Sequence, residues 1–182
     1  GTVRVLDIRP GASGSKLENL TNFSGTLFFA ADDSGTGTKL WKSNGVAANT
    51  ARVTNTSSGP SYLTNVNGTL FFSASDLTGR ELWKSDGTEA GTLLVKEIYK
   101  GNGGGGGPEG FTVVNGTVFF KANNGLIGRE LWKTDGTANG TVLVKDLIPT
   151  GGSNPKQFIG MNGTVYFVAF NQDNGPAFAK GR

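Results

Sequence analysis

One motif occurs twice in this chain almost letter for letter, and it limits the fold more than any other feature. It reads GRELWKSDGTEAGT at residues 79–92 and GRELWKTDGTANGT at residues 128–141. A weaker copy, TKLWKSNG, covers residues 38–45, and a shortened one, AFAKG, covers residues 177–181. We therefore expect a repeat protein in which each copy forms one supersecondary unit.

A second recurring feature, a Gly-Thr pair followed by three apolar residues, sets the period of the repeat. The four copies begin at Gly25, Gly68, Gly116 and Gly163, so they recur at intervals in the forties. Short strands and turns at such a period are typical of the blades of a β-propeller. The 30 glycines and 12 phenylalanines also favour strands joined by turns over helices.

Each unit is predicted to contain four short strands, as the third copy shows. Asn115-Gly116 suits a two-residue type I′ hairpin, because both central residues need positive φ. Asp135-Gly136-Thr137 is expected to turn the chain from the third strand into the fourth. The four strands are expected at residues 110–114, 117–122, 129–133 and 142–147.

Both faces of each small sheet should be covered by neighbours. Adjacent apolar residues such as Phe119-Phe120 and Leu131-Trp132 point to opposite faces of a strand. Blades packed around an axis satisfy both faces, so the predicted fold is an all-β propeller of four four-stranded antiparallel blades. Its units, within one domain, are expected at about 9–53, 54–98, 99–147 and 148–182 with 1–8.

The two ends of the chain indicate how this ring would close. Residues 2–8, TVRVLDI, match the fourth strand of a unit, and the chain ends just after a third strand. The N-terminal strand is therefore expected to complete the last blade. The glycine run at 103–107, in the link between two blades, is expected to be a flexible loop.

Residue types that are absent exclude several kinds of chemistry. With 0 cysteines and 0 histidines, the chain forms no disulfide, thiolate site, Ser-His-Asp triad or His-ligated zinc site. Carboxylate-pair chemistry of the glycosidase kind remains. The net charge of +3 is spread through the repeats, which argues against nucleic acid as a partner, and no stretch is apolar enough for a membrane span.

The repeated side chains are interpreted as structural. Aromatic residues that recur at the same place in each copy should pack between blades, and the Asp-Gly-Thr turns should hold the chain by hydrogen bonds; calcium binding there is the alternative. Glu81 and Glu130 are expected to form ion pairs at blade edges with the arginine that precedes each. The structural set comprises Trp41, Trp83, Trp132, Asp86, Asp135, Gly87 and Gly136, with Phe28, Phe71, Phe119 and Tyr166.

The copies at residues 81–88 and 130–137 resemble the ELWxxDGT repeats of large, mostly bacterial proteins. The first copy departs from that pattern at Lys39, where the glutamate would stand, and in the last copy Phe178 stands for the tryptophan. The resemblance implies a non-catalytic propeller, extracellular or at the cell surface, used in adhesion or ligand binding. Members commonly carry more repeats than four, so the chain is also expected to be a fragment or to self-associate.

A binding face is predicted where the variable loops gather. In an up-and-down blade, the second-to-third loops and the blade-to-blade links share one end, and variable loops on a rigid scaffold commonly bind ligands. The expected polar contacts are Asp32, Asp33, Asp76, Asn123, Asn124 and Asp173. No catalytic residue, metal site or cofactor is assigned.

Three functions are compatible with this pattern. The first is a binding or adhesion module for a glycan or a surface protein. The second is a structural subunit or a fragment of a larger propeller. The third is a glycosidase-like enzyme, which the sequence favours least because Asp32-Asp33 is the only adjacent carboxylate pair outside the repeated positions.

Overall fold

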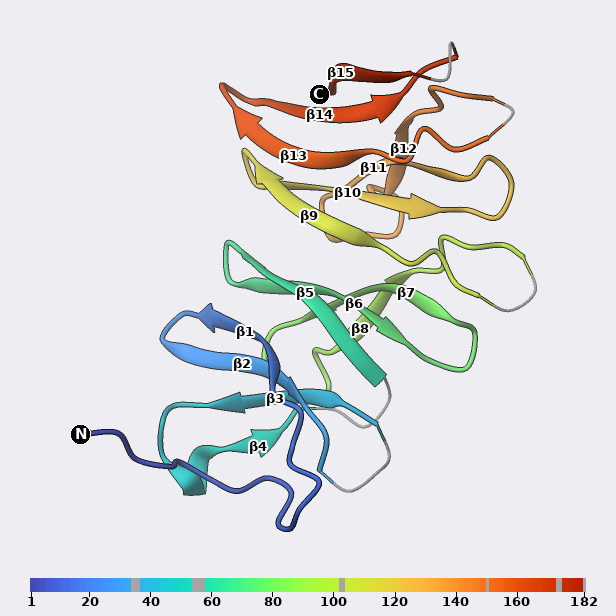
Figure 1. Ribbon diagram of the computed structural model, residues 1–182. Helices are drawn as coiled ribbons and strands as arrows, with labels where there is room; N and C mark the ends of the chain where they lie inside the picture. Colours follow the sequence, from blue (N-terminus) through green and yellow to red (C-terminus); the bar gives the residue numbers. More distant parts are fainter. Residues whose placement is uncertain (34–36, 54–57, 102–103, 150, 173–174, 182) are drawn as a thin grey trace. The chain divides into compact units, whose positions relative to one another are not determined.

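The computed structural model describes residues 1–182 except 34–36, 54–57, 102–103, 150, 173–174 and 182 (Figure 1). Short β-strands account for most of its regular structure, with one 3₁₀ helix, η1 (Ala47–Asn49), in the described ranges. The strands are β1 (Glu18–Phe23), β2 (Thr26–Ala31), β3 (Lys39–Ser43), β4 (Ala51–Arg52), β5 (Ser58–Val66), β6 (Thr69–Ser75), β7 (Arg80–Ser85), β8 (Leu93–Lys96), β9 (Glu109–Val114), β10 (Thr117–Asn123), β11 (Arg129–Thr134), β12 (Val142–Lys145), β13 (Lys156–Met161), β14 (Thr164–Phe170) and β15 (Pro176–Gly181).

The strands form four sheets, each built from consecutive strands. The first sheet is β1-β2-β3-β4, the second β5-β6-β7-β8, the third β9-β10-β11-β12 and the fourth β13-β14-β15. The registers determined between neighbouring strands are antiparallel. The all-β prediction and the four-strand meander are thus confirmed for three units, and the fourth contains three strands in the part of the chain that is described.

The first hairpin of every sheet turns as the sequence predicts. Asn67, Asn115 and Asn162 have φ values of 49°, 49° and 50°, and the glycine that follows each also has positive φ. Ser24-Gly25 adopts the same conformation in the first sheet. Two residues with positive φ give the twist that matches right-twisted strands, which is why Asn-Gly recurs here.

The predicted closure by the N-terminus is not shown. Residues 1–8 contain no strand, and in the described chain β15 pairs with β14 alone. Ile8 instead packs on the first sheet, against Phe29, Ala31 and Trp41. The structure therefore contains sheets of the kind a propeller blade requires without showing a closed ring.

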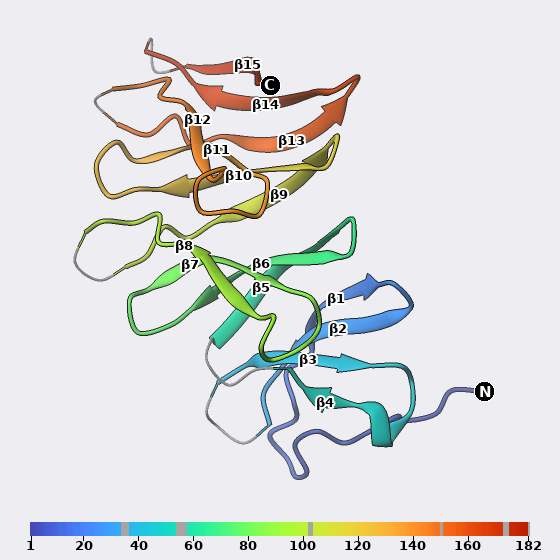
Figure 2. The same ribbon diagram turned by 180° about the vertical axis from the view of Figure 1, so that it is seen from behind.

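The chain divides into two compact units, which are described separately. One comprises residues 1–76 and 83–93, and the other comprises 77–82 and 94–182, so β7 and β8 are divided between them. In the second of these units β9 and β13 lie side by side (Figures 1 and 2). The core there joins the third and fourth sheets through Phe119, Leu131, Val165 and Phe167.

Most of the recurring aromatic side chains are buried. Phe28, Phe71 and Phe119 are at most 4% exposed, and Trp41, Trp83 and Trp132 at most 9%. Tyr166 is the partly exposed member and stacks on Phe178, with ring centroids 5.5 Å apart. Phe119 is buried with Val165 and Phe167, so it contributes to the joint between the third and fourth sheets.

The register of the last sheet corrects one detail of the sequence alignment. Phe178 pairs with Val168, as Leu131 pairs with Lys121 and Leu40 with Ala30. Phe178 therefore takes the place of the repeated leucine, and Ala179 takes the place of the tryptophan. None of the described helical segments has the length and apolar character needed to cross a membrane.

Candidate functional site

The glutamate of the repeated motif is a buried acceptor. Glu130, which is fully buried on β11, accepts hydrogen bonds from Ser153 N at 2.6 Å, Ser153 Oγ at 2.6 Å and Leu147 N at 3.4 Å. These donors belong to the segment that links the third sheet to the fourth. The carboxylate thus fixes the link by satisfying backbone groups that would otherwise be buried without a partner.

Glu81 has the same role one repeat earlier. It accepts hydrogen bonds from Ile98 N at 2.8 Å, Gly106 N at 2.9 Å and Tyr99 N at 3.3 Å. The predicted blade-edge ion pairs are therefore wrong. A glutamate buried against backbone N–H groups is a structural clamp, and it has no access to a substrate.

Burial raises the pKa of both Glu81 and Glu130, because removal from water disfavours the charged form. The hydrogen bonds from the linking segments act in the opposite direction and lower the pKa. A raised carboxyl pKa is common in catalytic acids, but these two groups are at most 1% exposed. The raised pKa therefore reflects burial in the protein interior.

The described part of the glycine run is held closely. Gly107 N donates to Arg80 O at 2.9 Å, and Gly106 O accepts from Asn123 N at 2.9 Å. A Cβ on Gly105 would lie 2.0 Å from Arg80 N. The expected flexible loop is thus corrected for Gly104–Gly107: glycine is needed because two backbone segments approach each other, and Gly103 lies outside the described residues.

The Asp-Gly-Thr turns are held by hydrogen bonds from the threonine to the aspartate. Asp86 Oδ1 accepts from Thr88 N at 2.8 Å and Thr88 Oγ1 at 2.7 Å, and Asp135 makes the same pair of bonds with Thr137. The bonds from Thr88 lower the pKa of Asp86. Within the described ranges, no three acidic side chains gather as a calcium site would require.

Two acidic residues of the predicted binding face, Asp32 and Asp33, form ion pairs with arginines. Asp32 Oδ2 accepts from Arg9 Nη1 at 2.5 Å, and Asp33 Oδ2 accepts from Arg52 Nη1 at 2.9 Å. Asp32 is 6% exposed, so its carboxylate is part of the protein interior. Asp76, in the same unit, is half-buried just after β6.

The amide residues proposed for that face fix their own loop. Asn123 Oδ1 accepts from Gly125 N at 2.8 Å, and Asn124 Oδ1 accepts from Leu126 N and Ile127 N. Asp173 lies outside the described residues. The predicted ligand role of all six residues stays a prediction, and for Asn123 and Asn124 the structure supplies a role in shaping the loop.

The sequence reasoning missed a charged cluster at the start of β9. Glu109 Oε1 accepts from Arg129 Nη1 at 2.6 Å and lies 3.4 Å from Lys121 Nζ, and Lys121 Nζ also reaches Asn154 Oδ1 at 3.4 Å. The Glu109 side chain keeps 27% of its surface exposed. Glu109 stands two residues after the glycine run, and this position was the sequence signal that could have drawn attention to it.

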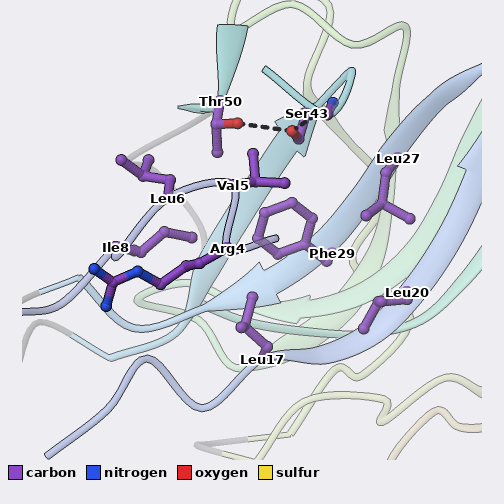
Figure 3. Close-up of a pocket in the computed structure, with 11 residues that line it drawn as sticks. Arg4, Val5, Leu6, Ile8, Leu17, Leu20, Leu27, Phe29, Ser43 and Thr50 are labelled. Atoms are coloured by element: carbon purple, nitrogen blue, oxygen red, sulfur yellow. Dashed lines mark hydrogen bonds between the residues drawn. The ribbon is translucent and has the colours of Figure 1, made fainter. Parts of the chain in front are cut away.

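A hollow of about 320 Å³ lies on the first sheet, between the N-terminal segment and β1–β3 (Figure 3). Val5, Leu6 and Ile8 of the N-terminal segment line it together with Leu27 and Phe29 from β2. Ser43 and Thr50, joined by a 2.7 Å hydrogen bond between their hydroxyl oxygens, lie at one end. The lining is mostly apolar, which suits an apolar side chain better than a sugar.

No protein-family model matches this chain, and no curated protein matches it. Similar solved structures include one named as an exo-β-1,3-galactanase from Bifidobacterium bifidum (TM-score 0.41, 11% identity, 90% of this chain and 65% of that one). Another is named a glycoside hydrolase (TM-score 0.46, 14% identity, 91% and 45%). A third is an engineered GH43 enzyme with endo-xylanase and exo-arabinofuranosidase activity (TM-score 0.41, 15% identity, 95% and 42%).

These structures correct two expectations from the sequence. The expected non-catalytic adhesion module and the expected absence of enzyme activity run against these comparisons, in which the similar solved structures are named as glycoside hydrolases. The chain spans between 42% and 65% of the length of these three structures. At 11–15% identity the likeness concerns the fold alone.

Proposed function

We propose that this chain is part of a propeller that hydrolyses glycosidic bonds, and that Glu109 is one of the two carboxylates that act on the substrate. The observation that carries the proposal is the cluster of Glu109 with Arg129 and Lys121 at the start of β9. Glycoside hydrolysis needs a pair of carboxyl groups and no other side-chain chemistry. This requirement fits a chain with 0 histidines and 0 cysteines.

Asp33 is also partly exposed and pairs with Arg52, but Glu109 contacts two cations, Arg129 and Lys121. Glu81 and Glu130 are sealed in the protein, and Asp86 is committed to the amide and hydroxyl of its own turn. Glu109 is oriented by two cations from neighbouring strands and is still partly open to solvent. A catalytic carboxylate needs both properties: a fixed position and access to the substrate.

The position of Glu109 within the sheet also supports this role. The residue begins β9 at the end where β10 stops at Asn123 and β11 begins at Arg129. This is the end with the variable loops and links, and Asn154 of the next link contributes to the cluster through Lys121. The proposal includes the closed propeller predicted from the repeats, with residues 2–8 as the fourth strand of the last sheet.

The test is hydrolysis of aryl galactosides, xylosides and arabinofuranosides by the purified chain. The panel follows the substrates named for the similar structures. We expect release of the aryl group from at least one of them, and a loss of 100-fold or more in kcat for Glu109→Gln, which keeps the shape but removes the charge.

Glu89→Gln is the matched control, because Glu89 is exposed in a turn and takes part in none of the ion pairs found among the described residues. It should leave the rate unchanged. Equal rates for Glu109→Gln and Glu89→Gln would remove Glu109 from the reaction. Failure of the wild-type chain to hydrolyse the whole panel would contradict the proposed activity.

A further inference from the structure

The first strand of each sheet contains a β-bulge at the same place. In β5, Tyr62 and Leu63 both stand opposite Phe72, between the paired residues on either side. A bulge of this kind strengthens the local twist and redirects a side chain, and bulges are common next to active sites. The registers place the same two-residue insertion at residues 19–20 of β1, 110–111 of β9 and 157–158 of β13.

The first residue of each bulge has a left-handed backbone. Its φ is 57° at Asn19, 58° at Tyr62, 71° at Gly110 and 57° at Gln157. Glycine adopts such an angle without strain, and asparagine tolerates it better than most side chains. A bulky residue such as tyrosine is an outlier in this conformation, and the strain is retained only where something offsets it.

Neither the bulge nor the core explains why this residue is a tyrosine. The equivalent positions hold asparagine, glycine and glutamine, so the bulge forms without an aromatic ring. Tyr62 is 45% exposed, whereas Phe71 and Phe72 on the neighbouring strand are 4% and 0% exposed. The strained residue therefore presents its side chain at the surface, which points to a role in binding.

Amide and hydroxyl groups hold the bulge of β5 in place. Asn19 Oδ1 accepts from Tyr62 N at 3.4 Å, and Asn19 Nδ2 donates to Pro60 O at 3.4 Å. Thr64 Oγ1 donates to Tyr62 O at 3.0 Å. These residues belong to one compact unit, and their strands are followed and preceded in the chain by others, so the exposure of Tyr62 does not arise from a chain end.

We propose that Tyr62 is a sugar-stacking residue, whose exposed ring packs against the apolar face of one sugar unit of a glycan chain. A tyrosine ring has an apolar face and a polar end, and a sugar ring likewise has a C–H face bordered by hydroxyl groups. The backbone of the bulge, fixed by Asn19, holds the ring in position before the glycan arrives. This inference rests on the proposed glycosidase function, because it assigns a binding residue for the same class of substrate.

The test measures binding to three soluble polysaccharides: arabinoxylan, arabinan and β-1,3-galactan. Electrophoresis of the folded chain through native gels that contain each polysaccharide gives a dissociation constant without requiring hydrolysis. We expect at least one polysaccharide to retard the wild-type chain. Tyr62→Asn, which removes the ring, should weaken that binding by about 10-fold or more, whereas Tyr62→Phe, which keeps it, should stay within about threefold of wild type.

Gln157→Asn is the matched control, because it makes the same kind of change at the equivalent bulge position of β13. Gln157 is exposed and has the same φ as Asn19, but it carries no ring. The variant should bind as tightly as wild type. Equal affinities of Tyr62→Asn and Gln157→Asn, or a wild-type chain that none of the three polysaccharides retards, would overturn the assignment of Tyr62.

The stability of the same variants separates binding from packing. Tyr62→Asn should have a urea midpoint at least as high as that of wild type, because asparagine fits the left-handed backbone with less strain. A midpoint well below wild type would show that the ring is retained for the fold, and the inference would be wrong.

Failure of this inference is distinguishable from failure of the proposed activity. A chain that binds a polysaccharide through Tyr62 but hydrolyses none of the aryl glycosides keeps the stacking residue and loses the glycosidase proposal. A chain whose hydrolysis depends on Glu109, but whose binding is the same with and without the Tyr62 ring, keeps the activity and loses the stacking residue.

Discussion

Replacement of Glu130 by alanine should destabilise the protein strongly, because it leaves the link between the third and fourth sheets without its acceptor. Ser153 N, which donates to Glu130 at 2.6 Å, and Leu147 N would lose their partner in an interior where Ser153 is 0% exposed. Each buried donor left unsatisfied costs about 1–3 kcal/mol. Relief from the burial of a charge offsets part of this, so we expect a net loss of about 3 kcal/mol.

The loss is measured by urea unfolding followed by tryptophan fluorescence, with Glu89→Ala as the control. For a chain of this size, a loss of about 3 kcal/mol lowers the melting temperature by roughly 6–12 °C. The control, at an exposed turn position, should change the free energy of unfolding by less than about 0.5 kcal/mol. A Glu130→Ala variant no less stable than Glu89→Ala would refute the clamp.

Two further predictions concern the same link. Gly152→Ala should lower the free energy of unfolding by about 2 kcal/mol, because the added Cβ would lie 2.4 Å from Arg129 N. Gly151→Ala is the control: its Cβ would lie 3.9 Å from the nearest side chain, so it should have little effect in the same urea titration. The raised pKa of Glu130 means that the folded state holds the proton more tightly than the unfolded state, so its contribution to stability is full below the ordinary value of 4.5 and is lost as the pH rises through the folded pKa. The unfolding free energy of wild type minus that of Glu130→Gln should therefore become less positive or more negative as the pH rises above 4.5, and a difference that does not change with pH would contradict this assignment.

The repeated sequence was sufficient to predict an all-β fold with four-stranded antiparallel sheets in three of the units. The Asn-Gly turns and the paired apolar residues act locally, so they determine hairpins and buried faces wherever a copy occurs. Closure could not be predicted in the same way. Residues 2–8 carry the pattern of a fourth strand, but pattern alone does not select the sheet with which such a strand pairs.

The charged residues were harder to interpret from the sequence. Glu130 next to Arg129 looks like a surface ion pair, but they alternate on β11, so Glu130 points into the protein while Arg129 reaches Glu109. The proposed role of Glu109 depends on its contacts with Lys121 and Arg129. These residues stand on other strands, so the sequence around Glu109 does not reveal the contacts. The resemblance to ELWxxDGT repeats and the expected extracellular or cell-surface location stay predictions.

The most direct test of the proposed hydrolysis is chemical rescue of Glu109→Ala, which removes the carboxylate entirely. If Glu109 acts on the substrate, added formate or azide should restore a measurable part of the rate by entering the space of the missing carboxylate. A folded Glu109→Ala chain that retains wild-type activity, or one that is inactive and shows no response to either anion, would contradict a direct role for Glu109 in glycoside hydrolysis.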